Sequence, residues 1–153
     1  MFEKNKLMWY ILVVYNRDIG DRMEILFELG ISDNDLKFIL EQCPNIVDME
    51  KDEIKEKIDI LTYVGCKERH IKNIIVSNPY YLDRFNEDLL KLISYLKQIG
   101  FTNIYLLFEA NPYFLNKDAF EIIEYVDKKI KIGMSLEDIV DEIESDPYII
   151  DEI

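Results

Sequence analysis

The acidic side chains are the residues of this chain whose spacing could support chemistry. In helical segments, Asp138, Asp141 and Glu142 would share one face, and Asp52 and Glu56 would share another. Neighbouring carboxylates can hold a divalent cation or act as general acid and base. However, 31 of the 153 residues are acidic, so some pairs must lie close together by chance. Acidic residues are seldom buried, and we therefore interpret both groups as solvated helix faces without a catalytic role.

Other catalytic and cofactor motifs are absent from the sequence. It contains no glycine-rich phosphate loop, no nucleophile elbow, no Cys-x-x-Cys and no His-Glu-x-x-His pattern. The single histidine, His70, and two cysteines, Cys43 and Cys66, are too few for a zinc site. His70 could contact phosphate or sense pH, but a surface position is the simplest expectation. We expect reduced core cysteines in a cytoplasmic protein that is not an enzyme and holds no cofactor or metal.

The charge of the chain is strongly negative and unevenly distributed. The net charge is −13, which favours basic partners and repels phosphate backbones at long range. Residues 25–59 carry a net −6 and residues 128–153 a net −5, whereas residues 60–94 carry a net +1. This middle segment contains a small basic cluster, formed by Lys67, Arg69, His70 and Lys72. The cluster could touch a few phosphates, but solvated positions beside acidic neighbours are the interpretation we favour, because non-specific DNA binding usually needs many more contacts.

Glycine and proline spacings show that the elements carrying these residues form an internal repeat. Four of the five glycines stand 35, 35 and 33 residues apart: Gly30, Gly65, Gly100 and Gly133. The prolines follow them after 14, 14, 12 and 14 residues: Pro44, Pro79, Pro112 and Pro147. Trp9 fills the proline position of a partial N-terminal unit. A fixed period of this size indicates stacked repeats, and we predict one domain over residues 1–153. Its units are a partial unit at 1–24, complete units at about 25–59, 60–94 and 95–127, and a partial unit at 128–153.

Each repeat unit predicts two helices joined at a proline corner. In the second unit, Glu68–Val76 has helical apolar spacing, and Pro79 must end this helix because the residue before proline avoids the helical region. A short bend at the proline would bring Tyr81 or Leu82 into the core. A longer helix is predicted over about Asn86–Ile99, ended by a left-handed glycine cap. The fold class is therefore an all-α solenoid of stacked helix pairs.

The repeated pattern resembles the mitochondrial transcription termination factor (mTERF) repeat over about residues 9–150. The residues that carry the likeness are Leu29-Gly30 with Pro44, Val64-Gly65 with Asn78-Pro79 and Leu82, Ile99-Gly100 with Asn111-Pro112 and Leu115, and Ile132-Gly133 with Pro147. The resemblance implies two antiparallel helices and a short 3₁₀ turn in each unit of a curved solenoid. It also implies binding of double-stranded nucleic acid through a basic inner surface.

A tyrosine follows three of the four prolines: Tyr80, Tyr113 and Tyr148. Core packing explains most aromatic residues of this chain. These three would nevertheless line one edge of the stack and, if exposed together, would form a ridge for a protein partner.

Two functional hypotheses remain after these observations. We favour a non-catalytic helical-repeat adaptor whose acidic curved surface engages a basic protein segment. The alternative is an mTERF-like protein that binds double-stranded nucleic acid through the basic cluster and regulates transcription. Incomplete units at the two ends would leave apolar surface for a homodimer. The apolar run Leu7–Tyr15 is too short to span a membrane, so no membrane association is expected.

Overall fold

The chain forms a stack of helix pairs in the computed structural model, which describes residues 17–152. Each complete unit contains a first helix, a short 3₁₀ turn and a second helix. The first helices are α3 (Asp33–Gln42), α5 (Glu68–Ser77), α7 (Ile104–Ala110) and α9 (Leu136–Ser145). The 3₁₀ turns are η2 (Pro44–Asp48), η3 (Pro79–Asp83), η4 (Pro112–Asn116) and η5 (Pro147–Glu152). The second helices are α2 (Arg17–Glu28), α4 (Lys51–Tyr63), α6 (Asn86–Ile99) and α8 (Ala119–Lys131). Within the described residues, α2 stands before the first complete unit, and α9 with η5 follows the last.

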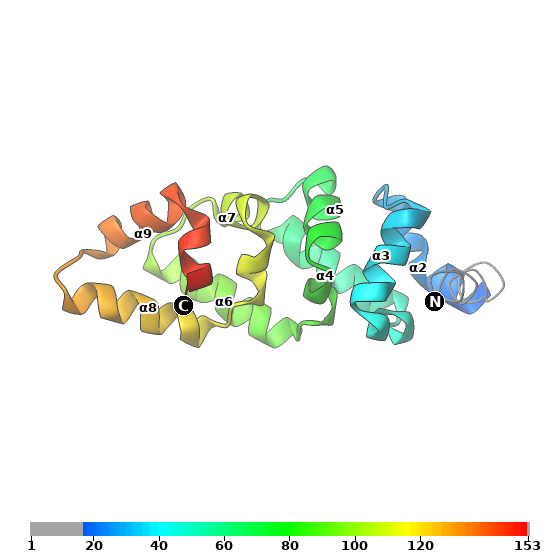
Figure 1. The fold of residues 1–153 in the computed structure, drawn as a ribbon, viewed down its shortest axis with the longest axis horizontal. Coiled ribbons are helices and arrows are strands. Elements are labelled where there is room, and N and C mark those ends of the chain that lie inside the picture. The colour runs from blue at the N-terminus through cyan, green and yellow to red at the C-terminus, as the bar shows by residue number, and fades with distance from the viewer. Residues whose placement is uncertain (1–16, 153) are drawn as a thin grey trace.

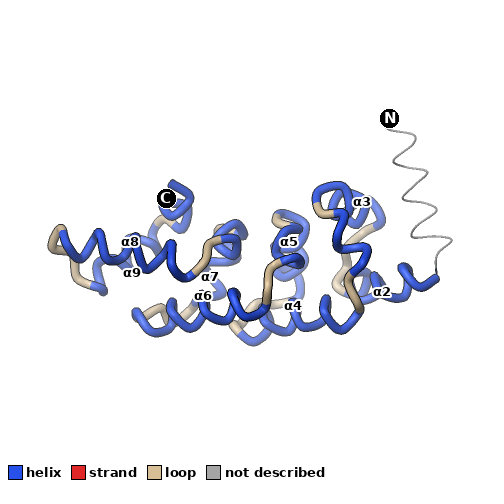
Figure 2. The backbone as a smooth tube through the Cα atoms, turned by 90° about the horizontal axis from the view of Figure 1, so that it is seen from below, coloured by secondary structure: helices blue, strands red, loops and turns tan. Residues whose placement is uncertain are grey.

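The units lie side by side along the long axis of the molecule, from α2 at one end to the α8–α9 turn at the other (Figure 1). Seen from below, α4 and α6 follow one long side of the stack, and α3, α5 and α7 lie across from them (Figure 2). Successive 3₁₀ turns contact one another from η2 to η5. Residues 17–152 contain helices and no strand, which confirms the predicted all-α repeat fold. The slot assigned to Trp9 lies outside the described residues.

The corners have the geometry that the sequence predicts. Asn78, directly before Pro79, takes an extended φ of −137° and ends α5, and the proline begins η3. Both Tyr81 and Leu82 are fully buried. Gly100 ends α6 in the left-handed region with a φ of 117°, as expected for a glycine cap.

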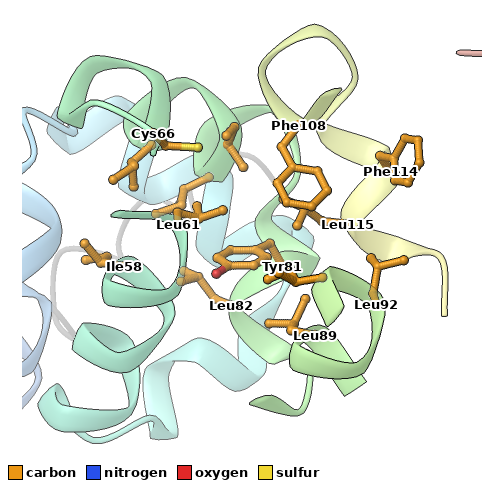
Figure 3. Packing of buried hydrophobic residues seen from close by; sticks show 14 of the residues in the cluster. Ile58, Leu61, Cys66, Tyr81, Leu82, Leu89, Leu92, Phe108, Phe114 and Leu115 are labelled. Carbon is orange, nitrogen blue, oxygen red and sulfur yellow. The ribbon is translucent and has the colours of Figure 1, made fainter. Parts of the chain in front are cut away.

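The core runs continuously through the stack. Figure 3 shows the Tyr81 ring among aliphatic side chains that include Leu61, Leu82 and Leu89. The buried Tyr81 hydroxyl donates a hydrogen bond of 2.5 Å to the backbone carbonyl of Lys57, which satisfies its polar end and ties η3 to α4.

The two cysteines are free and buried, as predicted. Burial raises the pKa of the Cys66 thiol to about 12, so this thiol stays protonated at neutral pH. None of the helices within residues 17–152 combines the length and the apolar character that a membrane span requires.

Candidate binding surface on the first helices

Buried asparagines at the corners hold neighbouring units together. Asn78 is fully buried, and its Nδ2 donates to the Pro112 carbonyl at 3.1 Å and to Asn116 Oδ1 at 2.9 Å. Asn116 Nδ2 donates back to Asn78 Oδ1 at 3.2 Å. These bonds join η3 of one unit to η4 of the next, and they therefore set the spacing of the first helices that these turns follow.

The two bonds that the corner amide donates recur one unit further along, but the first corner has a different residue. Asn111 Nδ2 donates to the Pro147 carbonyl at 3.1 Å and to Asp151 Oδ1 at 3.2 Å. At the first corner Cys43 occupies the equivalent position, where burial and then the nearby Asp83 raise the pKa of its thiol. The sequence shows the Asn-Pro pairs, but it does not show that their amides reach across to the next unit.

The predicted basic cluster lies at the start of α5. Lys67 and Arg69 are exposed, whereas Lys72 is half-buried. Lys72 leans over the neighbouring corner, where its Cδ would lie 3.8 Å from a Cβ on Gly30. Two exposed cations and one partly covered cation are therefore available at this helix. Three positive charges are few for binding a polyanion such as DNA.

His70 has partners that its place in the sequence does not reveal. The side chain is half-buried, and its Nδ1 lies 2.6 Å from Glu109 Oε1 on α7. Its Nε2 accepts a hydrogen bond of 2.9 Å from Arg69 Nε, so Nδ1 is the nitrogen that donates to Glu109. His70 therefore connects α5 to α7 instead of standing alone at the surface, and it also holds one of the cluster cations in place.

Helix α9 presents an acidic surface, because it carries five acidic residues and no basic residue. Glu137, Asp141 and Glu144 lie on one face of this helix and are exposed. Within residues 17–152, none of these three carboxylates has a hydrogen-bond or ion-pair partner. Like charges at such spacings each destabilise a helix by about 0.2–0.5 kcal/mol. The face therefore carries a small cost in stability.

These three carboxylates line a hollow of about 360 Å³ between α9 and the corner at Gly100. The hollow also contains the apolar side chains of Ile99 and Val140, together with Thr102. A Cβ on Gly100 would meet no atom within 4 Å, whereas the corners at Gly30 and Gly65 are covered by side chains of the next first helix. The third period is two residues shorter, and α7 has seven residues where α3, α5 and α9 have ten. The sequence shows the shorter period, but not the hollow beside it.

Of the two other acidic residues of α9, Asp138 and Glu142, it is Glu142 that faces the neighbouring helix α8. Its Oε1 accepts a hydrogen bond of 2.5 Å from the Tyr125 hydroxyl and lies 3.3 Å from Lys129 Nζ. The hydrogen bond from Tyr125 and the charge of Lys129 lower the pKa of Glu142. Asp138 and Asp141 are exposed, as predicted, but Glu142 joins α8 to α9.

We expect Glu142→Gln to lower stability at neutral pH and to matter less in acid. The pKa of Glu142 is lower in the folded chain than in the unfolded chain, so its contribution is present above the unfolded value of about 4.3 and is lost as pH falls through the folded value. The partly exposed bond should contribute roughly 0.5–1 kcal/mol at pH 7. Thermal unfolding followed by circular dichroism at pH 7 and at about pH 3 checks this.

Glu144→Gln is the matched control on the same helix, because that carboxylate has no partner within residues 17–152. Glu144→Gln should leave the midpoint temperature of thermal unfolding at neutral pH unchanged, or raise it slightly. Equal losses at both pH values for Glu142→Gln would contradict the assigned ion pair.

The three tyrosines of the predicted ridge stand on successive 3₁₀ turns. Tyr80 on η3, Tyr113 on η4 and Tyr148 on η5 are each about half exposed. The turns that carry them contact one another in series. A role for this row in partner binding stays a prediction.

Lys57 is a basic residue at a core position of α4. The side chain is 5% exposed, its Nζ donates to Asn86 Oδ1, and burial lowers its pKa. Asn86 Nδ2 in turn donates to Glu56 Oε2 at 2.8 Å. Asp52 and Glu56, the second carboxylate pair noted in the sequence, are exposed on α4. The described part of the chain contains no group of three or more side chains arranged to hold a metal ion.

Comparison with protein families matches the chain to the model of the mTERF family. The match covers residues 5–61 and, in an overlapping second segment, residues 45–151. Comparison with curated proteins gives no match.

Proposed function

The chain belongs to the mTERF family, and from that premise we propose that it is a non-catalytic binding protein that engages a basic protein segment. The observation that carries the proposal is the unpartnered acidic face of α9 beside the hollow at Gly100. The hollow offers apolar contact to the stem of a lysine or arginine, and the carboxylates lie where its charged end would be. The net charge of −13 would draw such a segment toward the protein.

A fluorescence anisotropy titration with a labelled lysine- and arginine-rich peptide tests this function. Binding should weaken as salt rises from about 50 mM to about 150 mM, because exposed charges are screened. Neutralising the face with Glu137→Gln, Asp141→Asn and Glu144→Gln together should reduce affinity about tenfold. The same variant should be as stable as the parent or slightly more stable, since it removes like-charge repulsion. Loss of folding therefore could not explain loss of binding.

The matched control removes three negative charges from the second helices. Asp21, Glu28 and Asp52 are exposed on α2 and α4. Their replacement by Asn, Gln and Asn changes the net charge by the same amount, and it should reduce peptide affinity much less. Equal effects of the two triple variants would mean that total charge attracts the peptide and that α9 is not the site.

The basic cluster on α5 supports nucleic acid as a second candidate ligand. mTERF proteins commonly bind nucleic acid, and Lys67, Arg69 and Lys72 are the cations brought together on one helix. The same titration with mixed-sequence duplex DNA decides between the two ligands. Salt-dependent DNA binding that is lost when these three residues become alanine, without binding of the basic peptide, would overturn the protein-partner proposal.

A further inference from the structure

A groove separates two of the second helices, α4 and α6. It has a volume of about 300 Å³, and its lining is contributed by Glu56, Asp59, Ile60 and Tyr63 of α4 and by Asn86 and Leu90 of α6. Elsewhere in this layer α2 packs against α4, and α6 packs against α8, but α4 and α6 are not in comparably close contact. The groove therefore lies at a gap in the packing of the second helices.

The groove exposes large apolar side chains that the repeat itself does not require. The side chain of Tyr63 is 71% exposed and that of Leu90 is 49% exposed. Two residues before the corner glycine, at the position of Tyr63, the other units carry polar residues: Glu28, Gln98 and Lys131. At the position of Leu90 the first complete unit has Lys55, and the third has Ile123. Fold packing thus tolerates polar residues at both positions, so the repeat alone does not account for the exposed apolar residues here.

Charged residues around the groove define what could occupy it. Glu56 and Asp59 are exposed along the α4 side, and Asp59 has no hydrogen-bond or ion-pair partner within residues 17–152. At the far end Lys97 Nζ lies 4.5 Å from the centroid of the Tyr63 ring and 3.3 Å from its hydroxyl. The Tyr63 ring is therefore already in contact with one cation, and the open α4 rim is negative.

We propose that the α4–α6 groove is the apolar anchor of the basic segment, which docks there as an amphipathic helix. This proposal rests on the proposed function, and it names the shape that the partner must have. A channel between two helices accepts a third helix, whose apolar side chains at helical spacing pack against Leu90 and Tyr63. Lysine or arginine on the flank of that helix would meet Glu56 and Asp59. The small volume suits one or two anchoring side chains and not a large cofactor.

The test compares two labelled peptides of identical composition by anisotropy. One peptide places leucine and lysine on opposite faces of a helix of about 18 residues, roughly five turns. The other has the same residues in scrambled order. The amphipathic peptide should bind about tenfold more tightly than the scrambled one, the difference expected from one well-buried apolar anchor.

Variants that place polar residues at these two positions test the site without threatening the fold. Tyr63→Gln copies Gln98, and Leu90→Gln makes the second position polar without adding a positive charge that would itself repel both peptides. Each should remove the advantage of the amphipathic peptide and leave binding of the scrambled peptide unchanged. Phe120→Gln is the matched control, because Phe120 is an exposed aromatic residue on α8 outside the groove lining; it should have no effect on either peptide.

The outcomes separate this proposal from the one on which it rests. If both peptides bind equally and the groove variants change nothing, the groove proposal is wrong and the acidic-surface function stands. If neither peptide binds even at low salt, both fail. If the α9 triple variant weakens both peptides while Tyr63→Gln affects only the amphipathic one, both hold, and the two surfaces contribute separately.

Discussion

Replacing Asn78 by leucine is expected to lower the free energy of unfolding by about 2–3 kcal/mol. The change keeps the approximate volume of the side chain, so it creates little cavity. It removes the three hydrogen bonds that join Asn78 to the Pro112 carbonyl and to the Asn116 amide. Asn78 is fully buried and Pro112 is half-buried, so the Pro112 carbonyl loses a bond that water does not readily replace at that position. Urea unfolding followed by circular dichroism measures the effect.

Asn103→Leu is the matched control for this change. Asn103 is exposed before α7, and its side chain makes no capping hydrogen bond. The same substitution there should change stability by less than about 0.5 kcal/mol. Similar losses of stability at both positions would show that the buried corner amide contributes no more than an exposed asparagine does.

The first corner allows the reverse experiment. Cys43 occupies the position of Asn78 and Asn111 but cannot donate as an amide does. Cys43→Asn should stabilise the chain by about 1 kcal/mol if the amide can donate to Pro79 and Asp83, the equivalents of the partners seen at the other corners. A destabilised variant would show that the first corner is shaped for the thiol.

The sequence was sufficient to predict most of the fold, because the repeat is encoded by residues whose effect is local. Proline ends a helix and glycine permits a left-handed cap whatever surrounds them, so the corners at Pro79 and Gly100 are predictable from residue type alone. A single glycine or proline is a weak indication of a helix end, but both residues recur four times at nearly constant spacing, which makes the prediction strong. The two helices of each unit are predicted by the helical spacing of apolar residues between these glycines and prolines.

The surfaces could not be predicted in the same way, because they depend on contacts between units. The partner of the His70 side chain is Glu109, which lies 39 positions later in the chain. The two side chains meet only because α5 stacks on α7. Lys57 resembles any surface lysine in the sequence, yet it is buried in the fold, where its Nζ donates to Asn86 at the start of α6. The sequence shows that the third period is two residues shorter, and α7 is correspondingly short, but nothing in the sequence shows the hollow that lies beside α9.

The two candidate surfaces share a cause in this irregular stacking. Where a side chain of the next unit covers a corner, as Tyr105 covers Gly65, that side chain fills the space beside the glycine and leaves no room for a ligand there. Where the cover is missing, as at Gly100, or where second helices stand apart, as at α4 and α6, apolar atoms and unpaired carboxylates remain accessible. Departures from the repeat are therefore the places where binding is expected.

Gly65→Ala should be the most damaging of the glycine substitutions, with a loss of about 3 kcal/mol. Gly65 has a φ of 109°, and an L-residue in the left-handed region costs roughly 1–2 kcal/mol. The added Cβ would also lie 2.9 Å from Cδ1 and 3.4 Å from Cγ of Tyr105, so the ring of the next unit must move. Overpacking of this kind costs about 1–3 kcal/mol, and the two effects add.

Gly133→Ala isolates the backbone part of this effect. Gly133 has a φ of 100°, and its Cβ would meet no atom within 4 Å, so only the strain of about 1–2 kcal/mol should be seen. Adding Tyr105→Ala to Gly65→Ala should remove the overpacking part of the loss, because the double variant has no ring for the new Cβ to displace. Urea unfolding of the single and double variants gives the coupling between the two positions. Equal losses for Gly65→Ala and Gly133→Ala, with no coupling to Tyr105, would mean that the corners respond to backbone conformation alone and that the next unit does not press on them.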